Sequence, residues 1–208
     1  MQYTLILCFF LLVVGSYAQI TQAGKDAILN AHNALRSKIA KGTYNARGDI
    51  RRAAINMKSV GWNDDYAIDA YRSIAQCPAN IARPTNGRGA NIKVVDVSGT
   101  QVADDYAKQA VAAWENQFQE KGWPVNNTVT ASLATQGLAE ATQMAYWHAG
   151  SIGCASQKCG SKVATVCYYS AKPFEGDQIY TMGPTCSRCP DFYVCNQATG
   201  LCNYQNTG

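Results

Sequence analysis

The sequence predicts an α+β fold that is stabilised by disulfide bonds, and three observations support this. Apolar residues recur at helical spacing over 25–40 and over 102–121. A β-branched run over 163–169 carries Cys167, and an apolar, aromatic run leads into Cys154, which predicts two core strands joined by cysteines. Of the nine cysteines, Cys8 lies in an N-terminal leader, and an even number remains, as is typical of fully paired cysteines in a secreted chain.

The leader comprises residues 1–18, which are uncharged and apolar from Leu5 to Val14. Ser16-Tyr17-Ala18 fits the small-x-small rule for cleavage, so the segment is predicted to be a secretory signal peptide that is cut before Gln19. Its apolar core is too short to span a bilayer, and we expect no membrane-spanning segment. We therefore expect a signal peptide at 1–18, one main domain at 19–175 and a cysteine-rich tail at 176–208.

The charge of the chain indicates no particular partner. The formal net charge is +4, which is modest for 208 residues. Nucleic-acid binding usually requires a much more basic chain or a basic stripe, so we expect no nucleic-acid partner.

The first helix, predicted over 25–40, ends before Gly42 and contains the segment HNALR. His32 in that segment is interpreted as a hydrogen-bonded packing residue, since a histidine on a helix face is more often that than a metal ligand. An exposed loop is expected at 43–52, and it contains Arg47, Gly48 and Asp49. In a tight exposed turn this triplet can place a carboxylate on the metal of an integrin-type receptor, although an incidental match is the more frequent explanation.

The next helix is predicted to be capped by Asp64 or Asp65 and to end at Cys77-Pro78. A long irregular segment follows at 78–99, with one β-type run from Ile92 to Val97. After the helix over 102–121, which Gly122 ends, the residues 123–133 are typical of an exposed loop. This loop contains the sequon Asn126-Asn127-Thr128, and glycosylation of Asn126 is predicted.

The stretch EATQMAYWHAGSIGC, which begins at Glu140, resembles the signature of the CAP superfamily, which comprises cysteine-rich secretory proteins, antigen 5 and pathogenesis-related proteins. HNALR, WENQF and the NM…W…C segment before Cys77 resemble further motifs of the family, in the right order over 25–202. The cysteine spacing of the tail is similar to that of the nematode SCP-like and venom-allergen-like members. The resemblance implies a three-layer α/β/α CAP sandwich with a small, disulfide-rich C-terminal hinge.

In the family, two histidines and two glutamates form a metal-associated tetrad. The matching positions of this chain hold Ile81, Ala90, Gln117 and Glu140. One carboxylate and one amide do not make a zinc site, since zinc prefers imidazole, thiolate and carboxylate donors. We therefore expect no catalytic residue, no metal site, no cofactor and no enzyme activity.

The resemblance also implies a disulfide pairing. We expect Cys77 with Cys154, Cys159 with Cys167, Cys186 with Cys195, and Cys189 with Cys202. The CxxC formed by Cys186 and Cys189 could in isolation hold zinc or support redox chemistry, but structural bridges are favoured in an oxidising compartment.

Two kinds of function remain open for such a chain. A scaffold that keeps its bridges but lacks the tetrad favours a secreted, non-catalytic interaction or effector protein with an immune or defence role, whose partner is an extracellular protein such as an integrin-type receptor. The alternative is an extracellular sterol or fatty-acid binding protein, since Ile81 and Ala90 would suit an apolar ligand. A hydrolase is disfavoured, because no spacing brings a Ser, His and Asp set together.

Overall fold

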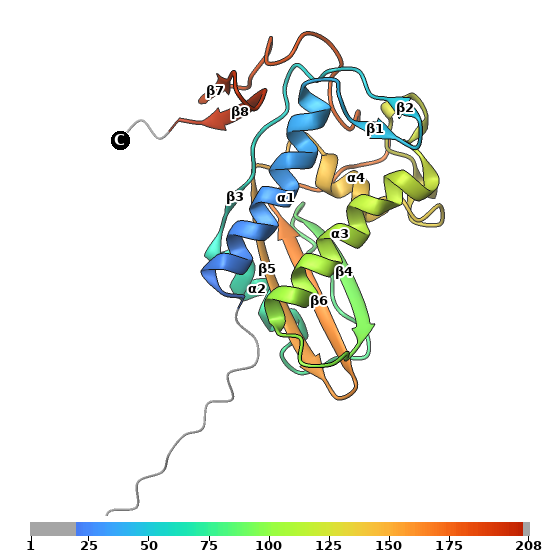
Figure 1. Ribbon diagram of the computed structural model, residues 1–208, viewed down its shortest axis with the longest axis vertical. Helices are drawn as coiled ribbons and strands as arrows, with labels where there is room; N and C mark the ends of the chain where they lie inside the picture. The colour runs from blue at the N-terminus through green and yellow to red at the C-terminus, as the bar shows by residue number, and fades with distance from the viewer. Residues whose placement is uncertain (1–19, 206–208) are drawn as a thin grey trace, which may run out of the picture.

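The computed structural model describes residues 20–205 (Figure 1). The predicted leader, residues 1–18, and its cleavage site before Gln19 lie outside these residues. Within them the chain forms helices and strands in the following order: α1 (Gln22–Ala40), β1 (Asn45–Ala46), β2 (Asp49–Ile50), β3 (Gly61–Trp62), α2 (Asp64–Ile74), β4 (Gly89–Asp96), α3 (Ala103–Lys121), the 3-10 turns η1 (Val125–Asn127) and η2 (Ala131–Leu133), α4 (Ala139–Ala145), β5 (Ser151–Cys159), β6 (Lys162–Tyr169), β7 (Tyr193–Asn196) and β8 (Leu201–Tyr204).

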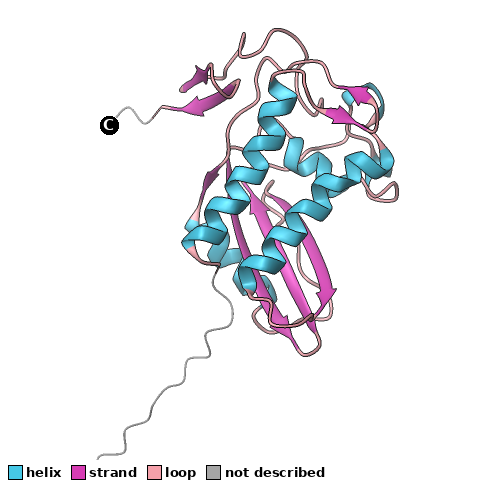
Figure 2. Cartoon of the chain, viewed as in Figure 1, coloured by secondary structure: helices cyan, strands magenta, loops and turns pink. Residues whose placement is uncertain are grey.

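The main sheet has the strand order β3-β5-β6-β4. Strands β4 and β5 both pair antiparallel with β6, while the short edge strand β3 runs parallel to β5. Two separate hairpins, β1-β2 and β7-β8, lie away from this sheet (Figure 2).

Helices cover both faces of the sheet, which confirms the expected three-layer α/β/α sandwich. Helix α2 packs against β5 and β6 on one face, while α1, α3 and α4 lie on the other (Figure 1). Alternate residues of β5 and β6 therefore enter two different cores. Ile152 and Tyr169 belong to the larger core with α1 and α3, whereas Ala155 and Val166 belong to the smaller core with α2.

Local chemistry determines where the helices begin and end. Thr21 caps α1 by accepting a hydrogen bond from the backbone N–H of Gly24, and Gly122 ends α3 with a positive φ of 84°. The N-cap of α2 is Asn63, whose side chain accepts from the N–H of Tyr66, so the expectation of a cap at Asp64 or Asp65 was wrong by one residue. These two aspartates instead occupy the first turn, where their negative charge interacts favourably with the positive end of the helix dipole.

Two predicted loops contain more structure than expected. Residues 43–52 include the hairpin β1-β2, which closes through a two-residue turn. Residues 123–133 are only partly exposed, because several of their side chains are buried in the main core, namely Trp123, Asn127, Val129 and Leu133.

Two of the four expected disulfides were wrong. The bonds are Cys77–Cys159 and Cys154–Cys167, in place of Cys77 with Cys154 and Cys159 with Cys167. The faces of β5 explain the difference. Cys154 faces the larger core directly opposite Cys167 on β6, whereas Cys159 lies five positions further along and therefore on the face that α2 covers. Cys77, which follows α2, is on that same side of the sheet.

The tail has two parts with different packing. Ile179 and Tyr180 are fully buried in the main core, so the chain after Gly176 still contributes to the sandwich. The remainder carries Cys186–Cys195 and Cys189–Cys202, the two bridges expected there. Among residues 20–205, no helix has both the length and the apolar content needed to cross a bilayer.

Candidate functional site

The four positions that match the family tetrad lie on different elements. Gln117 is on α3, Glu140 is on α4, Ala90 is on β4, and Ile81 follows α2. Gln117 and Glu140 are in direct contact, because the Nε2 of Gln117 donates to the Oε2 of Glu140 at 2.9 Å. The Oε1 of Gln117 accepts from the backbone N–H of Ala141 at 3.0 Å, so both ends of the amide are hydrogen-bonded.

An arginine occupies part of the same site. One terminal nitrogen of Arg83 lies 3.8 Å from Glu140 Oε1, and the other donates to the carbonyl of Ala90 at 2.6 Å. Ala90 is buried, and Ile81 packs against the smaller core that contains Ala90. Apolar packing and an ion pair therefore take the place of the ligands at this site.

The residues present do not fit the zinc ion that the family tetrad implies. The side chains of Ile81 and Ala90 have no donor atoms, and the amide of Gln117 already makes two hydrogen bonds. The Arg83 guanidinium beside Glu140 adds a positive charge where a cation would have to bind.

His32 and its surroundings form a buried hydrogen-bond chain next to the site. The Nδ1 of His32 is 2.8 Å from the carbonyl of Ile28, and its Nε2 is 2.9 Å from the hydroxyl of Tyr169. Asn91 donates to the same hydroxyl and to the carbonyl of Glu140. Burial lowers the pKa of His32 to about 4 and raises the pKa of Tyr169, so both side chains are neutral at pH 7. The interpretation of His32 as a hydrogen-bonded packing residue is confirmed.

Arg36 is the polar residue whose role the sequence did not reveal. Its side chain is fully buried and donates to five backbone carbonyls, those of Lys58, Met144, Tyr146, Trp147 and Ala149. Burial lowers its pKa to about 9, and the side chain remains charged at neutral pH. The HNxxR motif contains a second residue with the same role: Asn33 accepts from the N–H of Val60 and donates to its carbonyl. The motif was therefore the signal in the sequence that could have revealed the role of Arg36.

The Arg47-Gly48-Asp49 triplet lies at the tip of the β1-β2 hairpin. Arg47 and Gly48 form the two-residue turn with φ values of 54° and 92°, which is the geometry of a type I′ turn. All three residues are exposed, and the Asp49 side chain retains 61% of its accessible surface. Arg47 bonds the carbonyl of Glu120, while Asp49 pairs with Arg51, whose guanidinium lies over the ring of Trp123.

The sequon residue Asn126 is also exposed, and it has a positive φ of 56°. Its neighbour Asn127 is buried, where it accepts from Trp123 Nε1 and donates to the carbonyl of Tyr180. The acceptor Asn126 is accessible in this arrangement, and its glycosylation remains a prediction.

An open cleft of about 520 Å³ lies between the sheet edge and the tail. It is lined by Ser59–Gly61, by Gly150 and Ser151, and by residues of β7 and β8, including Tyr193 and Tyr204. The Nζ of Lys58 lies 4.8 Å from the centre of the Tyr193 ring, at one side of this cleft.

Fold and site together define a disulfide-stabilised three-layer α/β/α protein whose central polar site lacks the ligands for a metal. The sequence model of the cysteine-rich secretory protein family, CAP, matches residues 29–169. The chain belongs to this family, whose members are in general not enzymes.

Several relatives support the assignment. Ancylostoma secreted protein of Ancylostoma caninum is 29% identical over 88% of this chain, and venom allergen 5 of Vespula vidua is 31% identical over 71%. The chain spans 45% of the former relative and 71% of the latter. Among solved structures, NaASP2 with Zn²⁺ is 29% identical with a TM-score of 0.79, over 88% of this chain and 96% of that one. Na-ASP-1 is likewise 29% identical with a TM-score of 0.80, over 90% of this chain and 48% of its own.

Proposed function

We propose that the chain is a secreted, non-catalytic effector protein that acts by binding an extracellular protein. The observation that carries this proposal is the replacement of the tetrad by a closed pair, Gln117 and Glu140, beside Arg83. The Glu140 carboxylate, which is the one ionisable side chain among the four positions, is held by Gln117 and Arg83 and is therefore poorly placed to act as a general acid or base. Secretion is supported by the predicted leader, by the four disulfides and by relatives that are named as secreted and venom proteins.

The exposed hairpin supplies the contact in this proposal, and an integrin-type receptor is the partner. The type I′ turn is rigid because β1 and β2 pair on either side of it, so little conformational entropy is lost on binding. Asp49 must leave Arg51 to reach a receptor metal, and an exposed ion pair of this kind is worth only about 0–1 kcal/mol. Loss of this pair therefore costs little compared with a new carboxylate–metal bond.

The test is binding of the purified mature protein to a panel of immobilised integrins in the presence of Mn²⁺. We expect one or more integrins to bind, and we expect Asp49→Ala to weaken binding by about tenfold or more, or about 1.4 kcal/mol. The direct cause would be the loss of the carboxylate that coordinates the receptor metal.

A matched control is Asp96→Ala, which removes an exposed carboxylate from β4, an element separate from the hairpin. This variant should bind as the wild type does. If no integrin binds, or if Asp49→Ala and Asp96→Ala behave alike, the hairpin is not the receptor contact and the partner must be sought among other extracellular proteins.

The alternative, a sterol or fatty-acid binding protein, gains no support from the two apolar positions that suggested it. Ile81 and Ala90 fill space in the smaller core, where they contact protein side chains. Saturable binding of a sterol or fatty acid by the purified protein would restore this alternative.

A further inference from the structure

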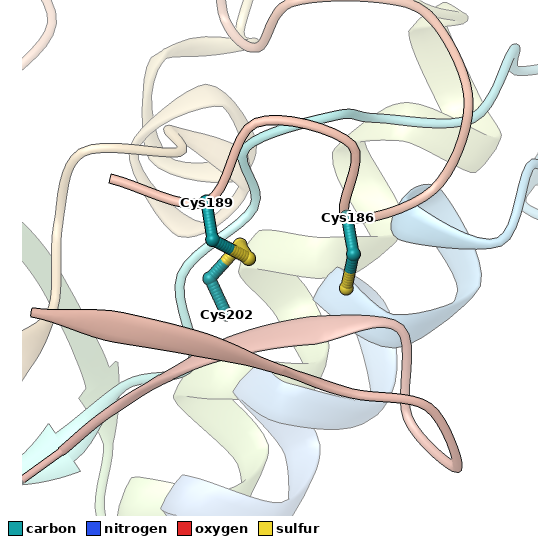
Figure 3. A group of neighbouring side chains, drawn as sticks. All are labelled: Cys186, Cys189 and Cys202. Atoms are coloured by element: carbon teal, nitrogen blue, oxygen red, sulfur yellow. A yellow bond between two sulfur atoms is a disulfide. The ribbon is translucent and has the colours of Figure 1, made fainter. Parts of the chain in front are cut away.

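The two disulfides of the tail lie side by side. The Sγ atoms of Cys186, Cys189 and Cys202 are all within 4.8 Å of one another, although they belong to two different bonds (Figure 3). Every one of these sulfurs is in a disulfide, so none is available as a thiolate ligand for a metal. A thiolate can, however, attack the sulfur of a neighbouring disulfide when it lies in reach, and this cluster satisfies that condition.

A second pairing of the same four cysteines is compatible with the backbone. Cys195 and Cys202 are directly opposite each other on β7 and β8. Cys202 donates its N–H to Met57 and accepts from Ser59, so neither group bonds Cys195. The two cysteines therefore form a non-hydrogen-bonded pair, the kind in which opposite Cα atoms approach to about 4.5 Å.

The chain already contains a bridge of this kind. Cys154 and Cys167 are opposite each other on β5 and β6, and they are bonded. The other two tail cysteines, Cys186 and Cys189, are separated by two residues in a CxxC, and their sulfurs lie within 4.8 Å of each other. Both bonds of a second pairing are thus within reach, namely Cys186–Cys189 and Cys195–Cys202.

We propose that the tail is a thiol–disulfide exchange site, at which a small thiol catalyst interconverts these two pairings. The thiolate of the catalyst attacks Cys195 Sγ, the Cys186–Cys195 bond breaks, and Cys186 leaves as a thiolate. Cys186 then attacks Cys189 Sγ, which forms Cys186–Cys189 and releases the Cys202 thiolate. Cys202 attacks Cys195 in the mixed disulfide, which forms Cys195–Cys202 and returns the catalyst as a thiolate. Two disulfides exist before and after, so no net oxidation or reduction occurs.

The four cysteines differ in solvent exposure, and the difference agrees with the order of the three exchange steps. Cys186, Cys189 and Cys195 are partly exposed, whereas Cys202 is fully buried. An external thiol therefore reaches Cys195 more readily than Cys202, and the buried sulfur takes part only in the internal steps.

The exchange changes how two arms of the tail are connected. The first arm, residues 183–189, bonds residues 53–55 through Gly183, Cys186 and Arg188, and the second arm, the β7-β8 hairpin, bonds Met57 and Ser59 through Cys202. The observed bridges both run from the first arm to the β7-β8 hairpin. In the second pairing each arm is closed on itself, and the hairpin that forms one wall of the cleft is no longer covalently attached to the other arm.

Peptide mapping of the wild-type protein distinguishes the two pairings. A protease that cuts before aspartate separates 177–190 from 191–208, because Asp177 and Asp191 are the last two aspartates of the chain. In the observed pairing the two fragments remain joined by both bridges. In the second pairing they separate, and each keeps an internal disulfide.

The oxidised protein is incubated in reduced and oxidised glutathione, quenched with acid and N-ethylmaleimide, and digested without reduction. We expect the joined fragments to be lost in part and the separate, internally bridged fragments to appear, with no gain in free thiol. Cys77–Cys159 and Cys154–Cys167 serve as internal references that keep their pairing. Fragments that stay joined under these conditions would overturn the proposal.

A variant tests the central step directly. Cys195→Ser leaves a thiol at Cys186 beside the Cys189–Cys202 bond, so we expect part of the N-ethylmaleimide label to shift from Cys186 to another tail cysteine, chiefly Cys202. The matched control is Cys159→Ser, which frees Cys77, a residue that has no comparable sulfur cluster within residues 20–205. Its label should remain on Cys77. Label found only on Cys186 in Cys195→Ser would overturn the internal attack.

Discussion

Buried polar side chains of α1 act by satisfying backbone or side-chain groups of distant segments. Arg36 is the extreme case, since its buried guanidinium donates to five backbone carbonyls and so links α1 to Lys58 and to the segment 144–149. His32 works in the same way but carries no charge, because burial disfavours the imidazolium. The motif is therefore structural in each of its polar positions.

The neutral state of His32 predicts a loss of stability in acid. The pKa of His32 in the folded state is about 4, below its usual value of about 6.5, so the unfolded chain binds the proton first as the pH falls. The stabilisation is complete above pH 6.5 and is lost as the pH falls toward 4. Between pH 7 and pH 4.5 we expect this residue to remove about 2.5 kcal/mol from the free energy of unfolding.

Urea unfolding at both pH values, with the disulfides intact, measures this change. His32→Gln should be less stable at pH 7 and should decline less steeply in acid. The exposed His148 provides the comparison: partial burial and the charge of Lys58 lower its pKa as well, so His148→Gln should also flatten the acid decline, but by less than His32→Gln does. Equal slopes in His32→Gln and the wild type would show that another group causes the acid sensitivity.

Individual elements show what could and could not be predicted from the sequence. The two long helices were predictable within a few residues because their apolar periodicity is strong and Gly42 and Gly122 follow them, and β6 was predictable from its β-branched run. The short helix α4 was missed, since its apolar residues continue into Tyr146 and resemble a strand. The β1-β2 hairpin was also missed, because its strands have two residues each and make no periodic pattern.

Two of the four expected disulfides were wrong because of the geometry of strand β5. Residues five positions apart on β5 point to opposite faces, so Cys154 faces Cys167 in the larger core and only Cys159 is on the side of α2, where Cys77 lies. The alternation was visible in the sequence, but which face α2 covers was not. We predict that Cys77→Ser leaves its free thiol at Cys159 and not at Cys154, as measured by N-ethylmaleimide labelling and peptide mapping.

The two bridges of the sandwich should also differ in how much each adds to the free energy of unfolding. Cys77–Cys159 spans a sequence separation of 82 and Cys154–Cys167 spans 13, so loop entropy assigns them about 4.5 and about 3 kcal/mol. A free thiol at Cys154 in Cys77→Ser would contradict the pairing itself.

Whether the tetrad site can hold a metal depends on how the whole molecule packs, because the four positions of the site lie on four different segments of the chain. The sequence was sufficient to identify the substitutions, but the Gln117–Glu140 contact and the position of Arg83 depend on packing across the sandwich. No local pattern encodes such contacts, which explains why Arg83 was missed.

Restoring the ligands should restore the site if the scaffold is otherwise intact. We expect no saturable zinc binding by the wild type in calorimetry. The combined changes Ile81→His, Ala90→Glu, Gln117→Glu and Glu140→His should introduce it, since imidazole and carboxylate are suitable zinc donors. The same protein without Glu140→His is the control and should bind much more weakly. Tight zinc binding by the wild type would mean that other residues supply the ligands.

The position of Arg36 also has a consequence for biosynthesis. Helix α1 is made early, yet the four carbonyls that Arg36 bonds beyond Lys58 lie 108 to 113 residues further along the chain. A growing chain cannot bury this guanidinium until residue 149 has left the ribosome tunnel. The native core around α1 can therefore be completed only after most of the chain has been synthesised, which makes early folding of the N-terminal part by itself unfavourable.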